Sequence, residues 1–441
     1  MKFLELSKPD FRTYTFTLED AHVTYANTLR RLILTGVETV AFRSDMTATG
    51  TTTDVTVKHN DTPMTNEMLA DRIGLLPIQV TDPTTWKEDD FLFTLTVAGD
   101  KDSVRYVKSE DFVVTDLSKA ALSGGAQDEF RVPTEQFFPK SRLTNDTCLI
   151  ASLQPGSGPA QQRVEIVAKA TKGTGREHAR FSPVSQCSYE YTPDKTEARI
   201  QEMFVKWATV SKKVQELDKA SERYQELWRE FNTMQVKRCF KINGKGEPYC
   251  FDFTVESIGI LSVPYIVNRA CEVGRQMCNR YAMIDQTKLP DEITISPADS
   301  RIIGFDFLFR GHDHTLGNLF QTWLVENHIE GEAQPRISYA GYAVPHPLRD
   351  EMVLRIGVES GKESDARAAV AAAARGCAGM FETMSVEWKG FIGSGAKPVA
   401  KASAAKPVMK ASESEEKSQA APQPRAAPKP MMARPQMASK K

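Results

Sequence analysis

Three histidines in the last third of the chain are the residues whose types and spacing could most readily do chemistry. His312 and His314 flank Asp313, and His346 follows later. Alternate side chains of a strand point to the same side, so these residues could bind zinc and make the chain a metal-dependent hydrolase. However, no glutamate or cysteine stands at a ligand spacing, and His314 also belongs to a helix-start motif. We therefore favour structural roles for these histidines and expect no metal and no other cofactor.

A short glycine-containing segment suggests a second chemistry, the binding of phosphate. Gly173 and Gly175 lie beside the cationic residues Lys172 and Arg176. The Gly-Lys-Ser or Gly-Lys-Thr that completes a phosphate-binding loop is missing, and strands are predicted on both sides. A tight turn is the better interpretation. The acidic metal-binding motifs of nucleotidyl transfer are also missing, so no catalytic residue is predicted.

The charge of the chain is divided between an acidic body and a basic tail. The chain has 441 residues, of which 41% are hydrophobic and 26% charged, as is typical of a folded soluble protein with two or three domains. The last 48 residues hold ten Lys or Arg and three Asp or Glu, which leaves an excess of eight acidic groups in residues 1–393. Because nucleic-acid binders gain affinity from clustered cations, we expect protein partners and no direct sequence-specific contact with nucleic acid.

The sequence contains neither a membrane segment nor a disulfide framework. No run of 18 apolar residues is present, and residues 1–6 do not resemble a signal peptide, so we expect an intracellular protein without membrane contact. The seven cysteines are widely spaced and include no Cys-x-x-Cys pair. This pattern favours reduced, mostly buried thiols over disulfides or a four-thiolate metal site.

Hydrophobic periodicity predicts the elements that position these residues. Apolar spacings of three and four indicate helices, and alternation indicates strands. Helices are predicted near 25–37, 66–73, 263–283, 315–327 and 364–384, and strands near 3–18, 249–256, 302–309, 337–339 and 352–358. Strands also dominate between 40 and 191. The tail after Gly393 has no aromatic residue and is expected to be disordered, because it cannot bury enough apolar area to offset chain entropy.

A different pattern occupies residues 196–234, where apolar residues step by three or four along a heptad seam that includes Trp207, Trp228 and Phe231. The pattern predicts a long helix or a helical hairpin. We favour an insertion that packs on its own domain over an intermolecular coiled coil, because the run is barely four heptads long. A free-standing regulatory adaptor that uses this segment stays an alternative function.

A short internal repeat indicates that the chain contains two related halves. Thr24-Tyr25-Ala26-Asn27-Thr28-Leu29 and Thr315-Leu316-Gly317-Asn318-Leu319-Phe320 share the pattern Thr, apolar, small, Asn, any residue, apolar. A strand precedes each copy and a helix continues from it. The Thr and Asn side chains are expected to bond to amides at the helix start, with Thr24 or Asn27 as the first cap. Two such α+β halves can bury their apolar helix faces against each other as an internal pseudo-two-fold dimer.

Several blocks of the sequence, taken in order, resemble a known family. The first four resemble the assembly subunit of cellular RNA polymerases, the lineage of bacterial alpha, archaeal D and the third RNA polymerase II subunit. They are Asn27-Thr28-Leu29-Arg30-Arg31-Leu32, Asp71-Arg72-Ile73-Gly74-Leu75-Leu76-Pro77-Ile78, residues 172–184 and Phe253-Thr254-Val255-Glu256-Ser257-Ile258-Gly259. Two more resemble its smaller partner, archaeal L or the eleventh subunit of RNA polymerase II; they are residues 312–318 and 340–348.

The resemblance implies an α+β fold in which two alpha-N-terminal-domain-like dimerisation halves pair within one chain. The first half carries a mostly β inserted domain and a helical insertion, and a linker leads to the second, smaller-partner-like half. The expected parts are the first half at 1–42 and 239–290, the inserted domain at 43–195, the helical insertion at 196–238, the linker at 291–300, the second half at 301–391 and the disordered tail at 392–441.

The resemblance also implies a function without catalysis. The chain would be a non-catalytic assembly platform of a multisubunit DNA-directed RNA polymerase that docks the second-largest subunit, through it the largest, and the small polymerase subunits. Its joined halves resemble the fused assembly subunit of certain large DNA viruses, which implies a host nucleus, a cytoplasmic virus factory or a virion as its location. The cysteine-rich loop that holds zinc or an iron-sulfur cluster in some relatives is missing, so no metal is carried over.

The residues carried over as subunit-interface positions lie at the two helix starts. In the family the Asn-x-Leu-Arg-Arg helix faces the second-largest subunit, so Arg30 and Arg31 are predicted to contact that partner, where arginine can form bidentate bonds to carboxylates. A solvated helix face is the alternative for this pair. The full predicted set is Asn27, Leu29, Arg30, Arg31, His314, Thr315, Leu316, Gly317 and Asn318.

Overall fold

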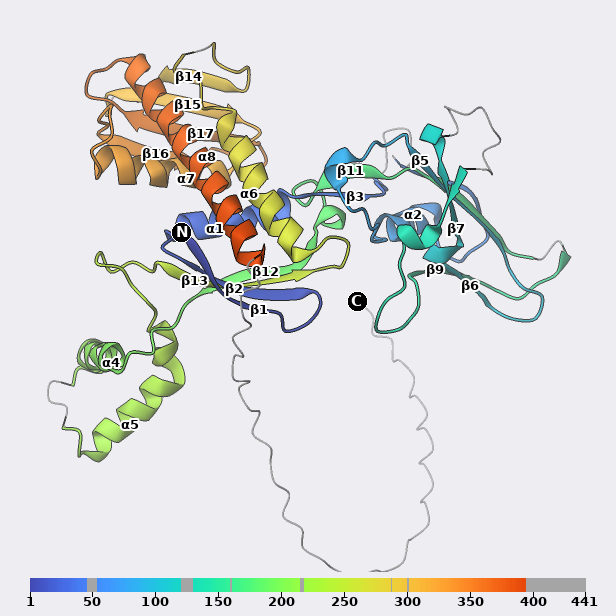
Figure 1. Ribbon diagram of the computed structural model, residues 1–441, viewed down its shortest axis with the longest axis horizontal. Coiled ribbons are helices and arrows are strands. Elements are labelled where there is room, and N and C mark those ends of the chain that lie inside the picture. The colour runs from blue at the N-terminus through green and yellow to red at the C-terminus, as the bar shows by residue number, and fades with distance from the viewer. Residues whose placement is uncertain are drawn as a thin grey trace, which may run out of the picture. The chain divides into compact units, whose positions relative to one another are not determined.

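The computed structural model describes residues 1–45, 54–119, 130–158, 161–214, 218–286, 288–299 and 301–393. The helices are α1 (Val23–Thr35), α2 (Asn66–Gly74), α4 (Glu197–Lys212), α5 (Glu222–Glu230), α6 (Val263–Asn279), α7 (His314–Leu324) and α8 (Glu363–Gly393) (Figure 1). The strands are β1 (Lys2–Ser7), β2 (Thr13–Glu19), β3 (Glu38–Ala41), β4 (Val55–Asn60), β5 (Phe91–Ala98), β6 (Arg105–Lys108), β7 (Phe112–Asp116), β8 (Arg131–Val132), β9 (Leu149–Leu153), β10 (Arg163–Ala168), β11 (Thr171–Thr174), β12 (Val184–Tyr191), β13 (Cys250–Ser257), β14 (Ile293–Pro297), β15 (Gly304–Arg310), β16 (Tyr339–Ala343) and β17 (Glu351–Gly357). The predicted tail at 392–441 lies outside the described residues except for 392 and 393, which end α8.

The first sheet brings together strands that are more than 200 residues apart in the sequence. Its order is β1-β2-β13-β12, and all neighbours are antiparallel. The register of β2 and β13 places Phe16 opposite Phe253, and their rings stack with centroids 5.2 Å apart. Alternation along β13 sends Phe251, Phe253 and Val255 into the core. The chain therefore leaves this half after β2 and α1, returns to its sheet at β12 and completes the sheet at β13 after the helical insertion. Residues 184–191 thus belong to the sheet of the first half, which corrects the predicted inserted domain at 43–195.

The segment that follows α1 is mostly β, as the sequence predicts. A five-stranded sheet has the order β4-β10-β5-β7-β8, and α2 packs against β4. Its core is a separate hydrophobic cluster in which Phe42, Phe93 and Phe112 are buried. α2 begins where the Thr65 side chain accepts a hydrogen bond from the amide of Met68, which satisfies one of the unpaired donors of the first turn.

The segment with the heptad pattern forms two helices, α4 and α5, in place of one long helix. α4 ends at Lys213, whose backbone is left-handed with a φ of 57°, and α5 begins where Ser221 accepts from the Tyr224 amide. Phe204 and Phe231, with Leu227, form a small hydrophobic cluster of their own. Part of the apolar seam therefore packs within the insertion, with Trp207 and Trp228 half-buried against this cluster, whereas Val210 of α4 is 70% exposed.

The second sheet contains a strand where the sequence analysis predicts a linker. Its order is β14-β15-β17-β16, and α7 packs on β16 and β17. β14 lies inside the segment 291–300, and its residue Ile295 is opposite Phe307 of β15. Pro297 is tolerated because β14 is at the edge of the sheet, where a missing amide breaks no bond within it. Residues 293–297 thus belong to the sheet, which corrects the predicted linker.

One hydrophobic cluster contains residues of both four-stranded sheets and of α1, α6, α7 and α8. Leu29 of α1 and Leu319 of α7 are both fully buried in it. α6 lies against α8, where a Cβ at Gly274 would be 2.8 Å from the ring of Phe381 (Figure 1). At the same contact the Trp388 indole donates to the Pro264 carbonyl over 3.0 Å. The segments around the two copies of the repeat therefore share one core.

Candidate subunit interface

The two helices of the repeat are capped by residues that precede it. His22 caps α1, and its Nδ1 accepts from the amide of Thr24 over 3.2 Å. Asp313 caps α7, and its carboxylate accepts from the amide of Thr315 over 2.7 Å. The prediction that Thr24 or Asn27 caps the first helix is wrong, because both residues lie within the helix, after its cap.

Arg31, predicted to contact a partner, is engaged within the chain. Its Nε donates to Thr315 Oγ1 over 2.8 Å, and its Nη2 lies 3.3 Å from an Asp313 carboxylate oxygen. The side chains of the ion pair are about one third exposed, so solvent screens part of their attraction. Burial opposes ionisation of Asp313, but its hydrogen bonds with Thr315 and the charges of Arg176 and Arg31 outweigh burial and lower its pKa. Asp313 therefore both caps α7 and holds α1.

The polar residues of the repeat bond to the opposite helix. Thr24 Oγ1 accepts from Asn318 Nδ2 over 3.3 Å and from Thr322 Oγ1 over 3.0 Å. Thr24 is 5% exposed, so these bonds satisfy a hydroxyl that water cannot reach freely. Beside it the Tyr25 hydroxyl donates to Glu326, and burial together with this carboxylate raises the pKa of Tyr25. The expected bonds from Thr24 and Asn318 to helix-start amides are replaced by bonds between α1 and α7.

The small and apolar residues of the predicted set are buried at the same helix crossing. Leu29 and Leu316 are fully buried. Gly317 lies directly against the ring of Tyr342, and a Cβ there would also come within 3.1 Å of Met352. His314 Nδ1 is 3.3 Å from the Tyr342 hydroxyl. These positions make contacts within the chain.

Arg30 and Asn27 differ from the other predicted residues because they line an open groove. Arg30 Nε donates to Asn27 Oδ1 over 3.0 Å. Both residues border a groove of about 920 Å³, together with the end of β12 and with Lys237 and Arg238. Arg30 is half-buried, and none of the ion pairs between described residues involves it. The predicted arginine pair is thus split: Arg31 binds inside the chain and Arg30 faces the groove.

Sequence reasoning missed Arg176 as a residue that joins distant segments. Arg176 follows β11, and its Nη1 donates to the Gly311 carbonyl over 3.0 Å, just before α7. Its Nη2 lies 3.1 Å from Asp350. Arg176 lies in residues 172–184, one of the sequence blocks that resemble the family, and this position indicated that the residue matters. No spacing in the sequence relates it to either partner.

Close packing explains the glycines that suggested phosphate binding. A Cβ at Gly173, in β11, would lie 2.7 Å from the ring of Phe181. A Cβ at Gly175 would collide with the backbone carbonyl of Leu34 in α1. Lys172 is directed to the Thr84 carbonyl, 3.5 Å away. The segment is a strand end and turn that passes close to α1, which agrees with the interpretation as a tight turn.

The histidines of the metal hypothesis have separate neighbours. His312 Nε2 is 2.6 Å from the Tyr281 hydroxyl, and burial, with the charges of Arg176 and Arg280, lowers the pKa of His312 to about 4. His346 Nδ1 accepts from the Leu348 amide over 3.1 Å. In the described parts of the chain, no group of three or more His, Cys, Asp or Glu is arranged to hold a metal ion. The hydrolase alternative therefore lacks a site among these residues.

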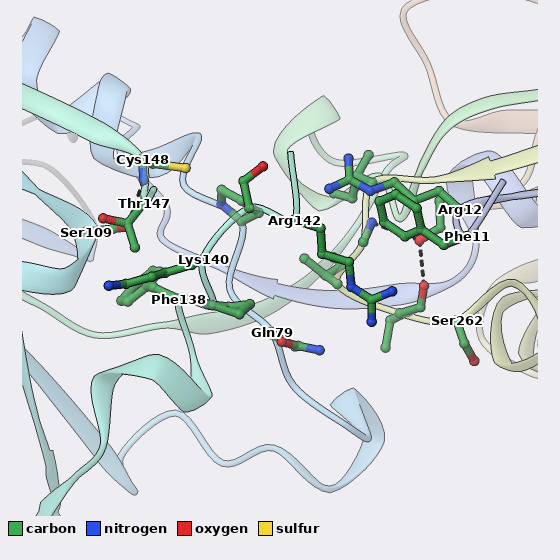
Figure 2. Close-up of a pocket in the computed structure, with 18 of the residues that line it drawn as sticks. Phe11, Arg12, Gln79, Ser109, Phe138, Lys140, Arg142, Thr147, Cys148 and Ser262 are labelled. Atoms are coloured by element: carbon green, nitrogen blue, oxygen red, sulfur yellow. Dashed lines mark hydrogen bonds between the residues drawn. The ribbon is translucent and has the colours of Figure 1, made fainter. Parts of the chain in front are cut away.

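A second groove lies at the loop between β1 and β2, where cations and aromatic residues meet. Figure 2 shows Phe11 and Arg12 on one side, Lys140 on the other, and Arg142 between them. The guanidinium carbons of Arg12 and Arg142 each lie 5.1 Å from the centroid of the Phe11 ring. Lys140 lies 3.7 Å from Glu110. The cations of this groove are thus in contact with the chain itself.

Comparison with protein families identifies the class to which this arrangement belongs. A model described as the RNA polymerase Rpb3/Rpb11 dimerisation domain matches residues 15–278. A second model with the same description matches residues 305–387. The first match alone spans more than half of the sequence, so the chain belongs to the RNA polymerase Rpb3/Rpb11 dimerisation domain family. The predicted resemblance to the polymerase assembly subunit and its smaller partner is confirmed.

Curated relatives agree with this family. The DNA-directed RNA polymerase subunit Rpo3 of Methanopyrus kandleri is 29% identical over 44% of this chain and 60% of its own length. The human DNA-directed RNA polymerases I and III subunit RPAC1 is 26% identical over 62% of this chain and 81% of its own. The corresponding Dictyostelium discoideum subunit is 31% identical over 38% of this chain and 46% of its own. The chain thus matches between about half and four fifths of the length of these relatives.

Membrane insertion finds no support in the helices of the described residues. None of them is both long enough and apolar enough to span a bilayer.

Proposed function

We propose that the chain is a non-catalytic assembly platform of a multisubunit DNA-directed RNA polymerase. The observation that carries the proposal is the occurrence, in one chain, of two dimerisation-domain matches whose helices share one hydrophobic core. The relatives carry the names of RNA polymerase subunits. A platform of this kind needs no substrate chemistry, because its role is to hold larger subunits in a fixed geometry.

In this proposal the two matched regions pair as an intramolecular counterpart of a heterodimer. The contacts of Arg31 with Asp313, of Thr24 with Asn318, and of α6 with α8 support it, since they join positions far apart in the sequence. We also propose the predicted domain boundaries with two changes. The inserted domain ends before Val184, because β12 belongs to the sheet of the first half, and the second half begins at Ile293, because β14 belongs to its sheet.

The proposed docking face for the second-largest subunit is the side of α1 that borders the groove. The largest subunit would join through the second-largest subunit, and the small polymerase subunits are further proposed partners. Asn27 and Arg30 support this face because they border an open groove. The other predicted interface residues would act indirectly. Through buried packing and hydrogen bonds they would hold α1 and α7 in place, so that Arg30 is presented at a fixed position.

The joined halves also support a proposal about the source of the chain. We propose that it is a fusion of two ancestral subunits that serves a viral polymerase, in a host nucleus, a cytoplasmic virus factory or a virion. Both dimerisation-domain matches lie in one chain, as a fusion requires. Mass spectrometry of fractionated infected cells and purified virions would test the location, and recovery from uninfected cells would contradict it.

Affinity purification of the tagged full-length chain, followed by mass spectrometry, tests the proposed function. The platform predicts that the two largest polymerase subunits co-elute in stoichiometric amounts. Unrelated client proteins in their place would favour the regulatory adaptor, and bound metal with hydrolytic turnover would favour the enzyme. Failure of the large subunits to co-elute, in an extract where they are present, would contradict the platform.

A further inference from the structure

The groove beside α1 is built from three separate parts of the chain. Arg30 comes from α1, the residues 187–191 come from β12, and Lys237 and Arg238 come from the short helical turn that ends the helical insertion. Phe240, two residues after the end of this turn, also borders the groove. The family match at residues 15–278 spans all three parts, but nothing in it assigns a role to the insertion.

The groove follows the open edge of a strand. β12 pairs with β13 on one side, and no strand of the described residues pairs with its other side. Five successive residues, 187–191, line the groove. Because successive side chains of a strand point to opposite faces, a groove on one face would touch only alternate residues. Contact with all five residues, together with the unpaired side of β12, supports a groove that runs along the edge, where backbone N–H and C=O groups are available to an extended peptide.

The charges around this edge are mostly positive. Arg30, Lys237 and Arg238 border the groove, and Glu190 is the one acidic residue among its lining. Lys237 and Arg238 are exposed, and no ion pair between described residues involves either of them. The body of the chain, in contrast, has eight more acidic than basic residues. A local cluster of uncompensated cations on an acidic body is complementary to an acidic partner.

Aromatic rings form the other wall of the groove. The ring centroids of Tyr191 and Phe240 are 4.8 Å apart, and those of Tyr191 and Tyr189 are 6.5 Å apart. Tyr191 is 38% exposed, so part of its ring is open to a partner. An extended segment that places alternate side chains on its two faces could set apolar residues against these rings and carboxylates towards the cations.

We infer that the groove binds an extended, acidic polypeptide segment of the second-largest polymerase subunit, which runs along the edge of β12. This inference rests on the proposed function and extends it, because it gives the helical insertion a role as the cationic wall of the docking site. A single-stranded nucleic acid would also meet cations and aromatic rings. The open backbone edge, which pairs with a peptide, and the acidic body of the chain favour the polypeptide.

Charge reversal of the insertion's cations tests the inference. The full-length chain with Lys237→Glu and Arg238→Glu is compared with a control that carries Lys206→Glu and Lys219→Glu, two exposed cations of the same insertion outside the groove. Affinity for the purified second-largest subunit is measured at low and at physiological salt. The groove variant is expected to bind at least about tenfold more weakly, with a smaller salt dependence, whereas the control binds as the wild type does. Circular dichroism verifies that both variants fold.

The possible outcomes separate the inference from the function on which it rests. If the wild type fails to bind the second-largest subunit, both are overturned. If the wild type binds and the two variants bind equally well, the inference is overturned and the platform stands. A third measurement uses a 20-residue oligouridine. If this RNA displaces the subunit from the wild type but not from the groove variant, the groove belongs to nucleic acid and the inference is wrong.

Discussion

The helices α1 and α7 begin with the same motif but use the two positions after it differently. In α7 these positions hold Gln321, whose Oε1 accepts from the Tyr342 amide over 3.0 Å, and Thr322, which donates to Thr24. In α1 they hold Arg30 and Arg31, and Arg31 bonds to α7 while Arg30 borders the groove. The shared motif therefore builds the helix crossing. The positions that follow it differ: both residues of α7 and Arg31 of α1 bond within the chain, whereas Arg30 borders the groove.

The sheet edges beside the two helices show the same contrast. β16 is an edge strand, and the side chain of Gln321 accepts a hydrogen bond from the backbone amide of Tyr342 in this strand. β12 is also an edge strand, but the residue that stands beside it is the cationic Arg30. An unpaired edge can serve as a template for another strand. The edge of β16 is partly protected from such pairing by Gln321, whereas the edge of β12 is open. The two halves thus share a core and differ in whether the edge beside the helix is occupied by the chain itself.

The largest expected effect tests the part that the two halves share. Leu29→Ala and Leu319→Ala should each lower the free energy of unfolding by about 2–5 kcal/mol, because both side chains are fully buried in one core. Val386→Ala, at a position that is 64% exposed, should change it by less than about 0.5 kcal/mol. Urea denaturation measures all three. A loss below about 1 kcal/mol at either leucine would contradict equal burial of α1 and α7.

The next effect concerns His312, whose counterpart before α1 in the repeat is Ala21. Burial lowers the pKa of His312 to about 4, so the unfolded chain takes up a proton that the folded chain resists. The contribution of His312 to the free energy of unfolding is fully present above the ordinary pKa of 6.5. It is lost as the pH falls towards 4, by about 1.4 kcal/mol per pH unit.

Unfolding measured between pH 7 and pH 4 should therefore depend less on pH in His312→Asn than in the wild type. His346→Asn, at an exposed position, serves as the control and should follow the wild type. Identical pH dependence in His312→Asn and the wild type would show that His312 is protonated as easily in the folded chain as in the unfolded chain.

A smaller effect is expected where α1 and α7 exchange polar bonds. Thr24→Val keeps the shape of the side chain but removes the hydroxyl that accepts from Asn318 and Thr322. The free energy of unfolding should fall by about 1–2 kcal/mol, because the donors are left unsatisfied. Thr35→Val removes an exposed hydroxyl that bonds only within α1, and it should cost less than about 0.5 kcal/mol. Equal effects of the two substitutions in thermal unfolding would refute a contribution from the bonds between the helices.

The smallest stability effect separates the two arginines. Arg31→Ala should lower the free energy of unfolding by about 0.5–1 kcal/mol, because it removes contacts with Thr315 and Asp313 that solvent partly screens. Arg30→Ala should leave stability unchanged within about 0.5 kcal/mol and weaken binding to the second-largest subunit more than Arg31→Ala does. Denaturation and binding assays on the same preparations measure both quantities. If Arg31→Ala weakened binding more than Arg30→Ala, the assignment of Arg30 to the docking groove and of Arg31 to contacts within the chain would be contradicted.

Much of the fold follows from local patterns in the sequence. Apolar spacing predicted α1, α6, α7 and α8 within a few residues at most of their ends, apart from the extension of α8 to Gly393. The repeat indicated two related halves. β14 was missed because its five residues end in Pro297 and lie in a polar stretch, and such a strand is acceptable only at a sheet edge. Which strand lies at an edge is decided by tertiary structure.

The candidate site was predicted less well, because its contacts join distant segments. The sequence pointed to Arg30 and Arg31 together, yet adjacent residues of a helix point in directions about 100° apart and meet different neighbours. The roles of His22 and Asp313 as caps were missed because they lie outside the repeated residues. Lys237 and Arg238 were not singled out, since no spacing relates the end of the insertion to α1.

The central claim is that the two matched regions are held together by a core that they share, and cleavage of the intact protein tests it most directly. A protease site inserted after Gln286, an exposed residue between α6 and β14, allows the folded full-length chain to be cut once. We predict that the two pieces then elute together from a size-exclusion column at micromolar concentration and separate only in denaturant. Separation of the pieces under native conditions would contradict the claim.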